Sequence, residues 1–278
     1  MTGAESPDRV ERTGVVSDEV AEALASLLGT EVPQRTLPPL WHWTHLLDRR
    51  PHADLGPDGH PTSGIPAPPG PGRRRMFAGG RVTTHGELVL GRPATRTTHV
   101  VRTQEKEGRS GPLTFVTVRN DYRQDGELVV VDDYEIVYRG EASTLSSAPR
   151  PDRPTPVTRP HLTLHADEAL LFRFSALTYN AHRIHYDHGF VRQEGYADLV
   201  VHGPLQALMM GELLRRDGAG LVGRTFAYRL VSPMVGPQTF TVTAAEDGLD
   251  AGAEVYDARG TLTAVSTVEP LDQAAQVG

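Results

Sequence analysis

The side chains best suited to moving protons lie together in residues 180–188, which read Asn-Ala-His-Arg-Ile-His-Tyr-Asp-His. A histidine side chain titrates near pH ~6.5, so it can take up and release a proton at neutral pH. We expect His185 to act as a general acid and base. Asn180 cannot titrate, and we expect its amide to hold a water molecule or a carbonyl group. The competing interpretation is that these histidines are structural or simply exposed.

A second chemical feature follows in Val200-Val-His-Gly-Pro-Leu-Gln206, where a β-branched pair gives way to a helical run. Gly203 stands where the helix is expected to begin. A free backbone N–H at a helix N-terminus, aided by the helix dipole, can stabilise a developing enolate oxygen. The alternative is that Gly203 only permits a turn, and the sequence leaves both interpretations open.

The sequence lacks the motifs that are typical of several other kinds of enzyme. His182, His185, Asp187 and His188 do not have the helical His-Glu-x-x-His spacing of a zinc site. There is no Gly-x-Ser-x-Gly, no glycine-rich phosphate loop and no dinucleotide fingerprint. The chain has no cysteine, which excludes disulfides and thiolate chemistry. We therefore expect neither a metal nor a redox cofactor.

The amino-acid composition limits the classes of partner that the chain is expected to bind. The chain has 278 residues, of which 38% are hydrophobic, and a net charge of −7. This composition is typical of a soluble globular protein, and the negative charge argues against a nucleic-acid or anionic-membrane partner. The N-terminal residues lack the apolar core of a signal peptide, and no stretch approaches the ~20 apolar residues of a membrane span. A cytoplasmic location is the default expectation.

The chain divides into two units. We expect a flexible N-terminus over 1–15, a first unit over 16–141, a Pro-rich linker over 142–160 and a second unit over 161–278. In the first unit, 17–29 has the pattern of a capped helix, and 97–106, 113–123 and 128–138 have that of strands. The run Arg73-Arg-Arg75 is most simply a solvated loop, with binding of a ligand phosphate or carboxylate as the sharper alternative.

The second unit repeats features of the first. It has a strand or turn at 161–165, helical patterns at 167–178 and 203–216, and strand patterns at 225–231, 239–246, 253–258 and 261–270. Leu88–Pro93 resembles Pro233–Pro237, and Tyr122–Leu128 resembles Tyr256–Leu262 at a nearly constant offset. This indicates a duplicated module in which a curved antiparallel sheet wraps one helix, here 203–216. The first unit has no matching long helix after residue 80, so we expect a degenerate first copy.

Asn180–Asp187 followed by Val201-His-Gly-Pro resembles the hydratase motif of the MaoC-like hot-dog superfamily. The resemblance implies an α+β double hot-dog fold. It places His185 on the family's catalytic histidine, Asp187 on the acid after it, and Gly203 on the glycine whose amide holds the thioester carbonyl. Asn180 falls where the family has its catalytic aspartate, and His182-Arg183 falls where it has Asn-Pro.

Phe174–Asp187 resembles the subgroup that contains mesaconyl-C4-CoA hydratase, itaconyl-CoA hydratase and hydroxyacyl-thioester dehydratase type 2. Pro39–Trp43, Leu55–Pro61 and Met76–Arg81 also resemble that subgroup. The resemblance implies reversible hydration of a 2-enoyl-CoA, with a short branched or dicarboxylic acyl-CoA as substrate. The side chains then expected to contact the substrate are Arg183, His202, Tyr179 and Arg75.

Because Asn180 stands where the family has its aspartate, two arrangements of the proton transfers are possible. Either His185 performs both proton transfers, which is the simpler arrangement, or another acid enters from outside the motif. The competing functions are a dehydratase acting on carrier-protein-bound acyl chains, a hot-dog thioesterase, and a protein that binds acyl-CoA without turning it over. Hot-dog relatives associate through their sheets, so a homodimer is expected by analogy.

Overall fold

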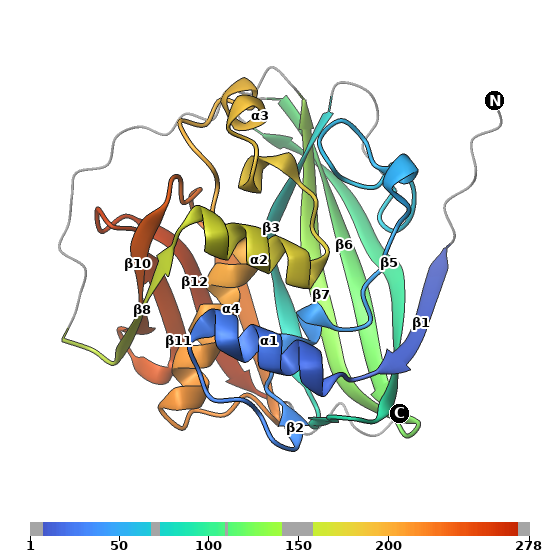
Figure 1. Ribbon diagram of the computed structural model, residues 1–278, viewed down its shortest axis with the longest axis vertical. Helices are drawn as coiled ribbons and strands as arrows, with labels where there is room; N and C mark the ends of the chain where they lie inside the picture. Colours follow the sequence, from blue (N-terminus) through green and yellow to red (C-terminus); the bar gives the residue numbers. More distant parts are fainter. Residues whose placement is uncertain (1–7, 68–72, 109–110, 141–157, 272–278) are drawn as a thin grey trace.

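The computed structural model describes residues 8–67, 73–108, 111–140 and 158–271. Their main element is a ten-stranded antiparallel sheet in the order β1-β5-β6-β7-β3-β9-β12-β11-β10-β8 (Figure 1). The first five strands in this order are β1 Arg9–Val15, β5 Pro93–Gly108, β6 Gly111–Gln124, β7 Glu127–Gly140 and β3 Arg73–Thr84. The other five are β9 Arg224–Leu230, β12 Leu262–Pro270, β11 Gly248–Tyr256, β10 Gln238–Ala245 and β8 His161–Ala166.

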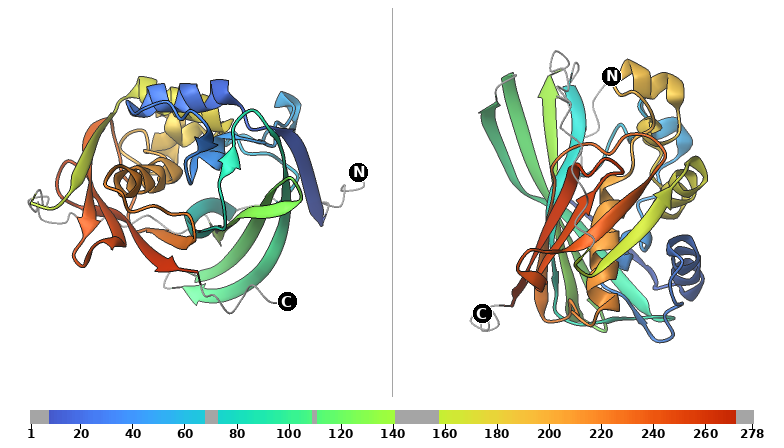
Figure 2. Two further views of the ribbon diagram at one scale, coloured as in Figure 1. Left: turned by 90° about the horizontal axis from the view of Figure 1, so that it is seen from below. Right: turned by 90° about the vertical axis from the view of Figure 1, so that its left-hand side faces the viewer.

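The sheet order shows the duplication. Read outward from the β3–β9 pair at the centre, the two halves run β3-β7-β6-β5-β1 and β9-β12-β11-β10-β8. In both halves, the outermost strand comes first along the chain and the innermost comes next, followed by a three-stranded meander. The predicted α+β double hot-dog is therefore confirmed, with the two sheets joined edge to edge into one curved sheet (Figure 2).

Each outer strand is followed by a helix with a side-chain cap. In α1, Asp18–Leu28, the Ser17 hydroxyl accepts from Val20 N–H, and Gly29 ends the helix in the left-handed region. In α2, Glu168–Thr178, the Asp167 carboxylate accepts from Leu170 N–H at 2.8 Å. The two helices pack against each other in front of the sheet (Figure 1), and both helices predicted from these patterns are confirmed.

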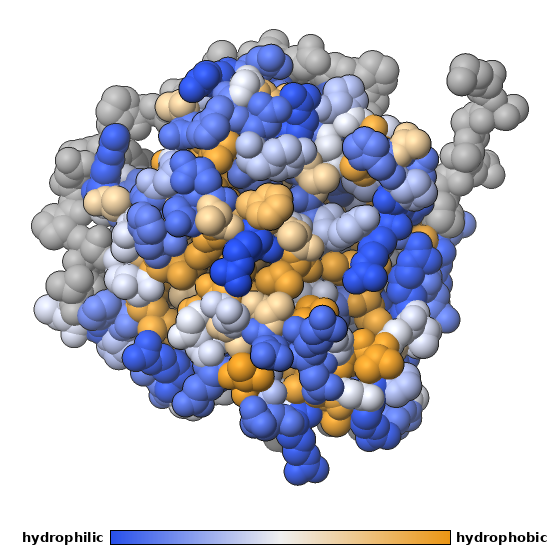
Figure 3. All heavy atoms as spheres, viewed as in Figure 1, coloured by the Kyte–Doolittle hydropathy of each residue, from blue (hydrophilic) through white to orange (hydrophobic). Residues whose placement is uncertain are grey.

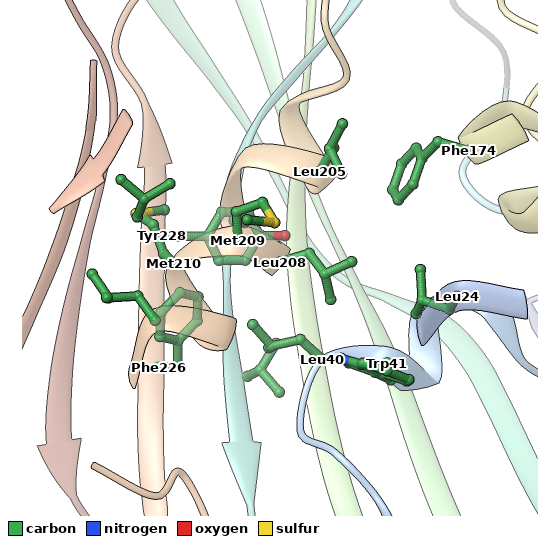
Figure 4. Packing of buried hydrophobic residues seen from close by; sticks show 14 of the residues in the cluster. Leu24, Leu40, Trp41, Phe174, Leu205, Leu208, Met209, Met210, Phe226 and Tyr228 are labelled. Carbon is green, nitrogen blue, oxygen red and sulfur yellow. The ribbon is translucent and has the colours of Figure 1, made fainter. Parts of the chain in front are cut away.

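The central helix is α4, Gly203–Arg216, and ten of its fourteen residues are buried. It lies between the strands of the second half and the outer pair α1 and α2 (Figure 2). Figure 4 shows Leu205 and Leu208 on its outer side, directed toward Phe174, Leu24 and Trp41. A helix enclosed on nearly all sides needs apolar residues around most of its circumference, which explains the high Leu and Met content of α4.

The first half has no counterpart of α4 among its described residues. The stretch between α1 and β3 instead contains β2 Thr36–Leu37, paired with β4 Leu88–Val89, and the 3₁₀ helices η1 Trp41–Thr44 and η2 His52–Asp54. Trp41 is fully buried and its indole N–H donates to Glu212 Oε1 at 2.7 Å. This bond attaches the first half's long loop to α4, so both halves share one helix.

Two expectations for the N-terminal half of the chain were wrong. Residues 9–15, predicted to be flexible, form the edge strand β1, which pairs with β5 from Arg9↔His99 to Val15↔Pro93. Most of its side chains face solvent, so it lacks the apolar alternation by which strands are recognised. The arginine run at 73–75 begins β3 and does not lie in a solvated loop. The predicted linker 142–160 lies outside the described residues, except for 158–160.

The face that carries α1 and α2 has apolar side chains gathered across its middle, with charged residues around them (Figure 3). Phe172 on α2 contributes to the exposed apolar surface, with 66% of its area accessible. Within the described part of the chain, no helix has both the length and the apolar character needed to span a membrane.

Candidate active site

The histidine-rich stretch folds as a chain of short capped turns. Helix α2 ends at Tyr179, whose backbone is in the left-handed region. The Asn180 Oδ1 atom then accepts from the His182 N–H at 3.0 Å, which closes an Asx turn. The 3₁₀ helix η3, Arg183–His185, follows at once. Asp187 caps the next helix, α3 His188–Gln193, through Gly189 and Phe190 N–H.

His185 is buried and held in one orientation. Its Nδ1 atom lies 2.7 Å from the Val200 carbonyl oxygen. Because a carbonyl can only accept, Nδ1 carries the hydrogen and the lone pair is on Nε2. Burial lowers the pKa of His185 to about 4, and the hydrogen bond to Val200 opposes this only in part. At neutral pH the ring is therefore an uncharged base with a defined tautomer.

The ring of His202 stacks against the ring of His185. The two imidazoles stack with centroids 3.6 Å apart and planes 18° apart. His202 is fully buried, and its Nε2 lies 2.8 Å from the Ser175 hydroxyl. Burial, and then the neighbouring histidines His185 and His182, lower its pKa well below the usual value. The neutral ring therefore fixes the position of His185.

Gly203 directly follows His202 and is the first residue of α4. Among the described residues no acceptor is bonded to the Gly203 N–H, as is usual for the first turn of a helix. A Cβ at this position would overlap the end of the Leu230 side chain, which would have to shift to admit it. The amide therefore stands near His185 at the positive end of the helix dipole.

A loop of the first unit reaches this site, and no role was predicted for its residues. His60 packs against His182 with ring centroids 4.1 Å apart, and His182 meets His185 edge-on at 5.6 Å. Four imidazoles thus form a row, in the order His60, His182, His185 and His202. The available sequence signal was Asp58-Gly-His60 within a loop rich in proline and glycine. In this spacing the carboxylate of Asp58 can accept a hydrogen bond from the imidazole of His60, two residues later.

Asp58 provides that bond. Its Oδ2 atom lies 3.0 Å from Nδ1 of His60, and its Oδ1 accepts from the His60 backbone N–H. Burial opposes ionisation of Asp58, but these bonds and the charge of His60 lower its pKa to about 2. Burial lowers the pKa of His60, and the hydrogen bond to Asp58 opposes this. Burial also lowers the pKa of His182, to about 2, and the neighbouring rings of His60 and His185 add to the effect.

The loop is attached through backbone contacts. The Arg183 N–H donates to the Asp58 carbonyl at 2.9 Å, and the Arg183 guanidinium donates to the Pro57 carbonyl at 2.8 Å. Gly59 has a φ of 88°, and a Cβ there would overlap the Ala181 carbonyl. Only glycine allows the loop to approach this closely.

The four side chains predicted to contact substrate lie in different surroundings. The Arg183 guanidinium pairs with Asp187 at 2.6 Å, Tyr179 is exposed at the end of α2, and His202 is buried beneath His185. Arg75, on β3, is half-buried, and its charge helps lower the pKa values of both His60 and His182. No described carboxylate pairs with Arg75.

Asp58, His60 and His182 are the described side chains whose donor atoms, all within 4.8 Å, are close enough to hold a metal ion. Two observations disfavour a cation. Both oxygens of Asp58 are bonded to His60, and the positive charge of Arg75 acts on both rings. The arrangement is better suited to orienting His60 than to ligating a metal.

Comparison with known proteins identifies the family. Residues 40–236 match the family model described as hydroxyacyl-thioester dehydratase type 2. The chain is 40% identical to mesaconyl-C4-CoA hydratase of Chloroflexus aurantiacus, with 97% of this chain and 99% of that protein covered. It is 24% identical to the mitochondrial hydroxyacyl-thioester dehydratase type 2 of Schizosaccharomyces pombe, covering 77% and 79% of the two chains.

The solved structures agree on the fold. HtdX of Mycobacterium tuberculosis superposes with a TM-score of 0.67 at 15% identity, covering 95% of this chain and 100% of that one. A MaoC-like dehydratase of Phytophthora capsici superposes with a TM-score of 0.65 at 13% identity, covering 98% and 97%. Taken with the family match, these findings show that the chain belongs to the hydroxyacyl-thioester dehydratase type 2 family of MaoC-like hydro-lyases, built on a double hot-dog fold.

Proposed function

We propose that this protein catalyses the reversible hydration of a 2-enoyl-CoA to a 3-hydroxyacyl-CoA. The proposed substrate is a short dicarboxylic acyl-CoA such as mesaconyl-C4-CoA. The observation that carries the proposal is that two groups lie in one site: His185, whose Nε2 is a base, and the Gly203 amide at the start of α4. Neither Nε2 nor the amide N–H is hydrogen-bonded to another group among the described residues. A base that activates water and a donor that stabilises the enolate oxygen are two of the components that addition of water to an unsaturated thioester uses.

In this mechanism the thioester oxygen accepts from the Gly203 N–H. His185 Nε2 takes a proton from water as the water oxygen bonds to C3, and the C2–C3 π electrons move onto the thioester oxygen. The helix dipole and the amide stabilise this enolate, which one well-placed donor can do by about 3 kcal/mol. Protonation at C2 then completes the addition. The Asn180 amide is proposed to hold the water.

Arg75 is the side chain best placed to bind a second carboxylate. Arg73 donates to Thr114 and to the Tyr138 carbonyl, and Arg74 pairs with Glu194. Arg75 has no such partner among the described residues, and it is close enough to His60 and His182 to affect their pKa values. An arginine near His60 and His182 that has no carboxylate partner among the described residues is suited to bind an anionic acyl group. The 40% identity to a mesaconyl-C4-CoA hydratase supports the same substrate class.

Replacing Arg75 by methionine is expected to lower kcat/KM for mesaconyl-C4-CoA by about 10- to 100-fold, because a hydrogen bond to a charged group contributes about 1.5–3 kcal/mol. The expected effect on crotonyl-CoA, which lacks the second carboxylate, is less than threefold. Arg81→Met is the control, since Arg81 lies on the same strand and is exposed. Equal losses for both substrates would contradict a carboxylate-binding role.

The function itself is tested by following the ultraviolet absorbance of crotonyl-, mesaconyl-C4- and itaconyl-CoA with purified protein, alongside a thiol trap. Loss of the conjugated enoyl thioester without release of free thiol is expected, and mesaconyl-C4-CoA should react fastest. Release of thiol would identify a thioesterase. No change with any of the three would leave a binding protein as the better interpretation.

A second candidate is dehydration of a 3-hydroxyacyl chain carried on an acyl carrier protein. The family match supports dehydration of a hydroxyacyl thioester and does not distinguish the thiol carrier. The two candidates differ in the thiol carrier, so comparison of the same acyl group on CoA and on a carrier protein separates them. The homodimer stays a prediction, which light scattering of the purified protein would test.

A further inference from the structure

We propose that His60, oriented by Asp58, is the second proton-transfer group of this active site and delivers the proton to C2. The inference rests on the proposed hydration and names a residue that neither the hydratase motif nor the second unit contains. It selects the alternative in which an acid enters from outside the motif. The active site is then built from both hot-dog units.

The geometry of His60 is that of an oriented acid and base. Asp58 lies 3.0 Å from its Nδ1, so Nδ1 carries the hydrogen and Nε2 is the reactive atom. The same carboxylate also accepts from the His60 backbone N–H, which fixes both partners in one short turn. The His60 side chain is 23% accessible, whereas His185 is buried. His60 can therefore meet a substrate that enters from the loop side.

Among the four rings of the row, His60 is the one best able to hold a proton. It alone has a carboxylate partner, since His185 bonds a carbonyl and His202 a hydroxyl in the described structure. His182 lies between His60 and His185, and burial and its two neighbours hold its pKa at about 2. His182 therefore stays neutral, and its uncharged ring lies between the protonated ring of His60 and the neutral ring of His185.

The proposed step balances. His185 Nε2 takes one proton from water, and the oxygen bonds to C3. The enolate electrons then form a new C2–H bond with the proton on His60 Nε2, leaving His60 neutral. The proton on His185 returns to His60 through solvent, which restores the starting state. In dehydration each group has the opposite role, as microscopic reversibility requires.

Charged groups from several elements surround His60. Burial lowers the pKa of His60. Asp58, on the same loop, opposes this and favours the protonated ring, whereas Arg75 on β3 lowers the pKa further. His182 and His185 contribute from the segment after α2, and the Arg183–Asp187 pair, bonded to the loop at Pro57, contributes opposite charges. The carboxylate nearest to the ring is that of Asp58, so its removal is the sharpest test of protonation at His60.

The test is the pH profile of kcat/KM for hydration in three variants. His60→Asn keeps a donor at the Nδ1 position but removes Nε2. Asp58→Asn keeps an acceptor for His60 but removes the charge that favours its protonated form. His52→Gln is the control, because His52 is an exposed histidine of the same loop. Circular dichroism and the melting temperature verify that each variant is folded.

In the wild type, kcat/KM should fall as the pH rises through the pKa of His60, which burial holds below its usual value, and as the pH falls through the pKa of His185. His60→Asn should lower kcat by about 100-fold or more, with KM changed by less than threefold, and remove the alkaline limb. Asp58→Asn should shift that limb to lower pH, because the ring loses the charge that favoured its proton. His52→Gln should behave as wild type.

An unchanged alkaline limb in folded His60→Asn would overturn the proposal, even where wild-type hydration is established. So would one tightly bound metal ion per wild-type chain, measured by elemental analysis and lost from His60→Asn together with activity. That result would identify the cluster as a metal site. If the wild type hydrates no enoyl thioester, the proposed function fails first, so the two failures are distinguishable.

Discussion

Replacing His185 by asparagine is expected to lower kcat for hydration by about 10³-fold, the typical contribution of a positioned general base. Asparagine can retain the hydrogen bond that Nδ1 makes to the Val200 carbonyl, so the loop should keep its conformation. What the variant lacks is Nε2, the atom proposed to take the proton from water. Steady-state kinetics with mesaconyl-C4-CoA at neutral pH measures the loss.

The control is His188→Gln, three residues further along. His188 is exposed and lies 3.0 Å from the Asp198 carboxylate, so its ring takes no part in the row. We expect activity within about twofold of wild type and an unchanged melting temperature. A His185→Asn protein that turns over at the wild-type rate would contradict the assignment of the base.

Replacing Gly59 by alanine is expected to lower kcat by about 100-fold in a protein that still folds. The new methyl group would overlap the Ala181 carbonyl, which is backbone and cannot move independently of the Asn180–Arg183 turn. The loop that carries Asp58 and His60 must therefore move away from His182, and the second proton-transfer group goes with it. Kinetics and the melting temperature together test this.

Gly126→Ala separates this clash from backbone strain. Gly126 has a φ of 86°, close to the 88° of Gly59, but a Cβ there would meet nothing within 4 Å. Both variants should lose about 1–2 kcal/mol of stability from the left-handed conformation. Only Gly59→Ala should lose activity. Full activity in both would show that the loop of the first unit is not needed for turnover.

The second unit was largely predictable because its signals are local. The helical pattern at 167–178 and the apolar content of 203–216 predicted α2 and α4, and in the first unit the cap at Ser17 predicted α1. The hydratase motif also lies within one stretch of chain, and the structure brings His185 and Gly203 together through the Val200 carbonyl and the start of α4. Patterns of this kind depend on neighbours in sequence, which a reader of the sequence can see.

The contribution of the first unit was not predictable in the same way. The bond between Arg183 and Pro57 joins residues 126 positions apart, and no periodicity connects them. Asp58 and His60 lie in a loop rich in proline and glycine, where polar residues are ordinary. The edge strand β1 and the start of β3 were missed because their polar side chains conceal the alternation of a strand.

The duplication is consistent with the proposal that both units contribute to the site. The second half supplies the helix whose N-terminus can stabilise an enolate, and the corresponding stretch of the first half contains no such helix among its described residues. That stretch instead forms the long loop that attaches to α4 through Trp41 and reaches the histidine row through Asp58 and His60. In the first unit, the segment at the position of a central helix thus reaches the site of the second unit.

The most direct test of the central claim is the fate of water oxygen. Mesaconyl-C4-CoA is incubated with the protein in H₂¹⁸O, and the products are analysed by mass spectrometry. We predict a CoA thioester that has gained one labelled water with the ¹⁸O at C3, formed by the wild type and lost in His185→Asn. Label in a free carboxylic acid, or equal labelling by the variant, would contradict hydration by His185.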